Sequence, residues 1–107
     1  MLYEAGENPS EFERMVNTHD KVVVVFYADW CGFCGRFCPE VRDVAKGSGS
    51  DFVMVNISDE ENPLWDKYRI DVVPTIMLFS RGSVVDRKSG RLERKDLLEF
   101  MRRHQVE

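Results

Sequence analysis

The stretch Val22–Cys34, which reads VVVVFYADWCGFC, decides the fold of this chain of 107 residues. Its first seven residues, Val22 to Ala28, form an apolar run that is rich in β-branched and aromatic side chains. Strands with one face in water alternate apolar and polar residues, so a continuous run indicates a central strand of a sheet that is covered on both faces. The run leads directly into two cysteines that are three positions apart.

These two cysteines, Cys31 and Cys34, lie where the strand gives way to a predicted helix. At the helix edge, Cys31 meets unpaired backbone N–H groups and the positive end of the helix dipole, and both favour a thiolate. Because the thiolate is the nucleophile in disulfide exchange, this position predicts a lowered pKa for Cys31 and makes it the attacking group. Cys34 lies one turn further along and is expected to stay a thiol until it resolves the reaction.

Helices and strands alternate along the chain, which predicts an α/β sandwich. A glycine-containing turn at residues 81–83 joins the last two strands as a hairpin. The last helix is expected to turn Leu97, Leu98 and Met101 toward the core. The predicted helices cover residues 8–18, 31 or 32 to 46, 62–68 and 92–104, and the predicted strands cover 22–28, 52–57, 75–79 and 84–87, with a further small strand at 2–4.

The composition is that of an ordinary globular protein and narrows the range of partners. Hydrophobic residues make up 43% and charged residues 32%, and the length suits a single domain covering residues 1–107. The 15 Lys and Arg against 19 Asp and Glu give a net charge of −4, which disfavours nucleic acid because phosphate binding requires positive charge. No apolar run approaches the ~20 residues that span a bilayer, so a membrane is not an expected partner either.

Several motifs, in order and at matching spacing over nearly the whole chain, resemble the thioredoxin family. A Cys-x-x-Cys pair alone is a weak signal, but it is specific when a buried strand precedes it and a Pro-Thr strand follows about forty residues later. The matching motifs are Trp-Cys-Gly-x-Cys at 30–34, Pro39, Asn62-Pro63, Val73-Pro74-Thr75 and Ser89-Gly90.

The resemblance implies the thioredoxin fold, with a central mixed β-sheet flanked by helices on both faces, and thiol–disulfide exchange that reduces protein disulfides. Cys31 would form a mixed disulfide with the substrate, and Cys34 would then release the reduced substrate, with no metal and no cofactor besides the redox-active Cys31–Cys34 disulfide. Val73–Pro74 would be a cis peptide bond, and the Val73 backbone would pair with the substrate chain. The substrate-binding residues implied are Trp30, Gly32, Phe33, Val73, Pro74 and Gly90.

The family also implies partners and an expected location. The substrates would be disulfide-containing proteins, and the electron donor would be thioredoxin reductase, with glutathione or a ferredoxin-linked reductase as alternatives. A monomer is expected. Residues 1–7 lack the basic and apolar regions of a signal peptide, which favours a cytoplasmic location.

The sequence departs from the family pattern at the motif and in the core. Most thioredoxins have a proline at the position of Phe33; its loss frees a backbone N–H to bond the Cys31 sulfur and predicts a more oxidising pair. Thioredoxins also usually bury an aspartate, thought to assist proton transfer at the second cysteine, and pair it with a lysine. The matching residues here are Val25 and Met54, and no other residue is indicated as a replacement base for Cys34.

Three alternative functions stay open beside disulfide reduction. One is a disulfide oxidase or isomerase, one is a domain that holds a metal or Fe–S cluster through its three cysteines, and one is a non-catalytic protein-binding domain. The third cysteine, Cys38, is expected to be a small buried hydrophobe, because a regular helix holds it too far from Cys31 and Cys34 for a disulfide. His19 and His104 fall near predicted helix ends, where capping or solvation is expected.

Overall fold

A five-stranded β-sheet forms the centre of the computed structural model, which describes all 107 residues. The strands lie in the order β1-β3-β2-β4-β5. Strands β1 and β2 both run parallel to β3, whereas β4 runs antiparallel to β2 and to β5, so the sheet is mixed. The strands are β1 (Leu2–Gly6), β2 (Lys21–Tyr27), β3 (Asp51–Asn56), β4 (Thr75–Ser80) and β5 (Ser83–Ser89).

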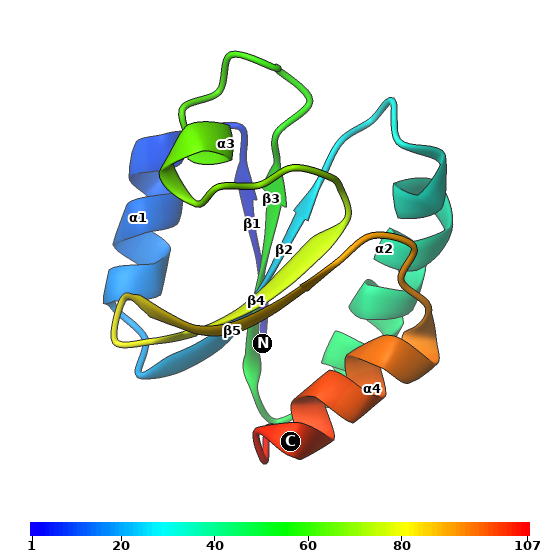
Figure 1. Cartoon of the computed structure of the whole chain (residues 1–107). Coiled ribbons are helices and arrows are strands. Elements are labelled where there is room, and N and C mark those ends of the chain that lie inside the picture. The colour runs from blue at the N-terminus through cyan, green and yellow to red at the C-terminus, as the bar shows by residue number, and fades with distance from the viewer.

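Four helices cover the two faces of this sheet. Helices α1 and α3 lie on one side, and α2 and α4 lie together on the other (Figure 1). This arrangement confirms the predicted α/β fold with a mixed sheet flanked by helices on both faces. The helices are α1 (Pro9–Asn17), α2 (Gly32–Lys46), α3 (Leu64–Lys67) and α4 (Arg94–Arg103).

Strand β2 occupies the middle of the sheet, as its continuous apolar run predicts. It is hydrogen-bonded to β3 on one side and to β4 on the other, and its residues 22–26 are all buried. They belong to one hydrophobic cluster of 32 buried residues that extends over both faces of the sheet. Strand β2 is thus paired on both sides and buried. This fixes the direction in which the chain leaves the sheet at residue 28, and the two cysteines follow at that end of the strand.

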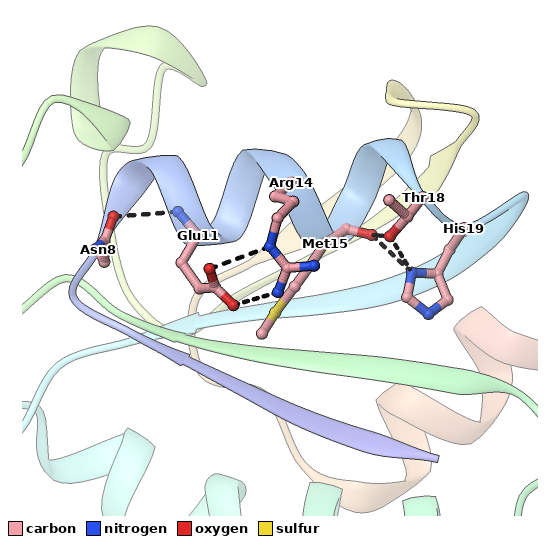
Figure 2. Close-up of polar contacts among 6 residues, drawn as sticks. All are labelled: Asn8, Glu11, Arg14, Met15, Thr18 and His19. Atoms are coloured by element: carbon pink, nitrogen blue, oxygen red, sulfur yellow. Dashed lines mark hydrogen bonds and ion pairs between the residues drawn. The ribbon is translucent and has the colours of Figure 1, made fainter.

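Helix α1 is capped at both ends by side chains (Figure 2). At its start, the side-chain oxygen of Asn8 accepts the backbone N–H of Glu11 at 3.1 Å, which satisfies one unpaired donor of the first turn. At its end, Thr18 Oγ1 donates to the Met15 carbonyl at 3.0 Å, and His19 Nδ1 lies 2.6 Å from the same oxygen. Of the two expected roles of His19, capping or solvation, the structure shows capping.

The structure corrects three details of the sequence prediction. Helix α3 is shorter than residues 62–68, because the side chain of Asn62 accepts the N–H of Leu64 and donates to the carbonyl of Glu7 instead of continuing the helix. Helix α4 begins at residue 94 rather than 92, because Glu93 is its N-cap and forms a capping box with the third helical residue. Leu98 is 41% exposed, so the prediction that it faces the core is wrong.

Replacing Phe12 by alanine is expected to lower the free energy of unfolding by about 3–5 kcal/mol. Phe12 is fully buried, and its ring makes edge-to-face contacts with three others, Phe26, Tyr68 and Phe79, at centroid distances of 5.4 to 5.8 Å. Urea unfolding measures the change. The matched control is Leu98→Ala, which removes an exposed apolar side chain and is expected to change stability by less than about 0.5 kcal/mol. Equal losses in the two variants would contradict this description of the core.

Candidate active site

Cys31 is the N-cap residue of α2 and lies at the point where the chain leaves β2. Its backbone is extended, with φ −92° and ψ 116°, and its Sγ atom accepts the backbone N–H of Cys34 at 3.2 Å. The sulfur thus takes the place of the oxygen that usually caps a helix. Cys31 is partly exposed, whereas Cys34 is only 2% exposed, and all three cysteines are free thiols. The two motif cysteines therefore differ sharply in their access to solvent.

A second segment, distant in sequence, meets Cys31 across the site. The Cys31 thiol lies 3.3 Å from the carbonyl oxygen of Val73, to which it donates a hydrogen bond. The peptide bond between Val73 and Pro74 is cis, as the family resemblance implies. The backbone N–H of Gly90 donates to the Pro74 carbonyl at 3.1 Å, and Gly90 has φ +106°, a conformation that favours glycine. Three chain segments thereby converge around the Cys31 sulfur.

Two large aromatic side chains are exposed beside Cys31. Trp30 is 56% exposed and Phe33 is 46% exposed. The indole N–H of Trp30 donates to the Ser58 carbonyl at 2.8 Å, and its ring stacks on Trp65 with an interplanar angle of 8° and a centroid distance of 6.3 Å. These contacts hold an apolar surface in place next to the sulfur. The pattern of the sequence indicated Trp30 but contained no signal for Ser58 or Trp65 as its supports.

The surroundings of the two thiols set the order of their acidities. The neighbouring Cys38 thiol and burial raise the pKa of Cys34 far above its ordinary value, so Cys34 stays protonated. Burial also raises the pKa of Cys31, although the backbone N–H groups of Cys34 and Phe33 act in the opposite direction. The expected net lowering of the Cys31 pKa is therefore wrong. Of the two thiols, Cys31 is the more exposed, and its pKa is raised far less than that of Cys34.

The core beneath the site is apolar where most thioredoxins have an acid and a lysine. Val25 on β2 and Met54 on β3 are directly paired across the two strands, and both are fully buried. No carboxylate can reach Cys34 from this position. Cys34 instead borders an open pocket of about 220 Å³, whose other lining residues include Tyr27, Asp29, Cys38 and Arg42. The sequence contained no signal for this pocket, because its walls come from β2, the loop that follows it and α2.

The remaining candidate groups do not form a second centre. Cys38 is buried, in agreement with its expected packing role. No group of three or more His, Cys, Asp or Glu side chains is arranged to hold a metal ion. His104 lies at the end of α4, where its Nε2 atom is 2.8 Å from a carboxylate oxygen of Asp86. None of the four helices has the length and apolar character needed to cross a bilayer.

Iodoacetamide is expected to modify Cys31 in the dithiol protein and to spare Cys34 and Cys38, because both of these are buried and the pKa of Cys34 is raised. The pKa of Cys31 is itself raised, so its thiolate is the minor form at neutral pH. The rate is therefore expected to increase about tenfold per pH unit between about pH 6 and pH 8.

Peptide mass spectrometry locates the adduct, and Cys31→Ser is the control that loses the fast reaction. Modification of Cys34 at a similar rate, or a rate that does not change with pH over this range, would contradict the assigned order of acidities.

Comparison with known proteins agrees with this geometry. The thioredoxin family model matches residues 5–103. A thioredoxin from Mycoplasmoides gallisepticum is 33% identical over 96 residues, which cover 89% of this chain and 95% of that protein. The chloroplastic thioredoxin Y2 of Arabidopsis thaliana is 36% identical over 92 residues, and the match covers 84% of this chain but only 55% of that longer protein. The crystal structure of thioredoxin f2 from Chlamydomonas reinhardtii has a TM-score of 0.85 at 27% identity, with 98% of this chain and 97% of that one covered. The chain belongs to the thioredoxin family and is a thiol–disulfide oxidoreductase with a Cys-x-x-Cys pair.

Proposed function

We propose that the chain reduces disulfide bonds in proteins, with Cys31 as the nucleophile and Cys34 as the resolving thiol. One observation carries the assignment of roles: the two thiols are three residues apart, yet Cys31 is partly exposed at the helix edge and Cys34 is buried. A substrate sulfur can approach the first but not the second. The redox group is the Cys31–Cys34 pair itself, so the reaction needs no further cofactor.

The proposed exchange has two steps. In the first, the Cys31 thiolate attacks one sulfur of the substrate disulfide, and the other substrate sulfur leaves as a thiolate that takes up a proton. In the second, Cys34 loses its proton and attacks the Cys31 sulfur, which breaks the mixed disulfide and releases the second substrate thiol. Two electrons have then passed from the dithiol to the substrate, and the protein holds a Cys31–Cys34 disulfide. A reductase of the thioredoxin reductase class restores the dithiol.

The surface around Cys31 suits a polypeptide substrate. Trp30 and Phe33 present large apolar side chains, and exposed apolar surface of this kind is typical of contact sites. We propose that an extended substrate segment lies against these side chains and pairs with the backbone at Val73, next to Pro74 and Gly90. A Cβ atom at Gly32 would meet no other atom within 4 Å, so the chain borders open space directly after Cys31.

We also propose that the protein works as a monomer in the cytoplasm. Reduction of disulfides requires a compartment that keeps thiols reduced, and the cytosol is such a compartment. Cell fractionation tests the location. Sedimentation of the purified dithiol protein tests the monomer.

The Cys34→Ser variant is expected to trap a mixed disulfide between Cys31 and a model substrate such as insulin, because the second step cannot follow the first. The adduct is detected by non-reducing electrophoresis and located by mass spectrometry. Wild-type protein serves as the control that turns over without accumulating the adduct. A trapped adduct on Cys34 in Cys31→Ser, formed as fast as the adduct on Cys31, would reverse the proposed roles.

The reduction potential of the Cys31–Cys34 pair is expected to be less negative than the value of about −270 mV for thioredoxin but well below the value of about −180 mV for protein disulfide isomerase. The reason is that the backbone N–H of Phe33, which a proline would lack, is a hydrogen-bond donor to the Cys31 sulfur in the dithiol form and so stabilises that form. Equilibration with glutathione buffers measures the potential. Phe33→Pro removes this N–H and is expected to make the potential more negative. A wild-type value at or above about −180 mV would indicate an oxidase or isomerase instead.

A further inference from the structure

A groove of about 610 Å³ lies directly beside the active-site motif. Its lining residues belong to the first half of α2, which begins with the motif, and to the start of α4 with the segment that leads into it. We refer to it as the Phe33 groove, because Phe33 forms its boundary toward Cys31. Four of its lining residues are basic, namely Arg36, Arg91, Arg94 and Lys95.

Two of these four basic side chains are not neutralised by the protein. Arg94 is paired with Glu40 at 2.8 Å and with Asp43 at 2.7 Å, and Lys95 lies 4.0 Å from Glu93. In contrast, neither Arg36 nor Arg91 has a carboxylate oxygen within 4.0 Å, although most other arginines of the chain form an ion pair. Both side chains are exposed. Two uncompensated guanidinium groups therefore face the groove in a chain whose net charge is −4.

The carboxylates of the groove do not cancel this charge. Glu40 is occupied by Arg94. Glu93 is the N-cap of α4, and its carboxylate lies 4.0 Å from the ammonium group of Lys95. The groove therefore keeps a local positive charge next to the nucleophilic sulfur.

Arg91 is also placed in relation to the exposed ring of Phe33. Its guanidinium carbon lies 5.3 Å from the centroid of that ring, a cation–π distance. The contact places the guanidinium beside the exposed aromatic surface that borders Cys31. Guanidinium groups bind carboxylates through two parallel hydrogen bonds, which makes arginine well suited to recognise Asp or Glu.

We propose that the Phe33 groove binds an acidic side chain that lies close to the disulfide of a substrate protein, so that the enzyme prefers disulfides in acidic segments. The inference rests on the proposed function, because it concerns the substrates of the same cysteines. Charge complementarity identifies the occupant: a positive groove in a negatively charged protein attracts an acidic segment and repels a basic one. Phe33, which departs from the family pattern within the motif, contributes the aromatic wall.

The test compares two disulfide-linked peptides of equal length that differ only in carrying Glu or Lys next to the cysteine. The wild type is expected to reduce the acidic peptide roughly five- to tenfold faster, as kcat/KM, and this advantage is expected to shrink at high salt. The double variant Arg36→Gln/Arg91→Gln is expected to lose the preference. The matched control is Arg69→Gln/Arg102→Gln, which removes two exposed arginines that also lack an ion pair but lie outside the groove, and it is expected to keep the preference.

The possible outcomes distinguish a failure of the proposal about the groove from a failure of the proposed disulfide reduction. The groove would not determine the substrate preference if the wild type reduced the two peptides at equal rates. The same conclusion would follow if both double variants lost the preference equally. Failure of the wild type to reduce either peptide would instead overturn the proposed function on which the inference rests. A preference that disappears only in Arg36→Gln/Arg91→Gln supports the proposal.

Discussion

The hydrogen bond from the backbone N–H of Cys34 to the sulfur of Cys31 is the contact on which the site depends. It caps the first turn of α2 with a thiol instead of an oxygen, and so it places the Cys31 sulfur at the end of the helix rather than inside it. The buried strand β2 holds the chain before this point and the helix holds it after, so the sulfur has little freedom of position. The same turn carries Cys34 into the interior. One local interaction therefore separates an accessible thiol from a protected one.

The rest of the site is assembled around this turn by contacts between distant segments. The Val73 carbonyl meets the Cys31 thiol, and Gly90 is bonded to Pro74, so the start of β4 and the end of β5 both face the helix start. Trp30 is held by Ser58 and by Trp65. Each of these groups belongs to a loop or strand end whose other side is fixed to the core. A rigid sheet with functional residues at its edge explains how a small protein can present a defined surface to a polypeptide.

The interior beneath Cys34 shows how this chain differs from the usual family pattern. Val25 and Met54 extend the apolar core across two paired strands, where a buried acid and lysine would have had to be desolvated. The proton of Cys34 consequently has no buried carboxylate to go to, and the thiol borders a surface pocket instead. Phe33 changes the site in another way, since it supplies a backbone N–H to the Cys31 sulfur and an aromatic ring to the neighbouring groove.

The sequence by itself determined the central strand, the start of α2 and the pair of cysteines, because each of these is encoded by neighbouring residues: an unbroken apolar run, a helical periodicity and a spacing of three. The family resemblance added the cis bond at Pro74. Only the tertiary structure decided the acidities of the thiols, the support of Trp30, the pocket beside Cys34 and the position of Arg91 over Phe33. These properties come from residues that are far apart in the chain and meet through packing, and local patterns carry no information about which distant side chains will face each other. For the same reason, the pKa of Cys31 could not be predicted from its place at a helix end, since burial by the rest of the fold outweighs the two N–H groups.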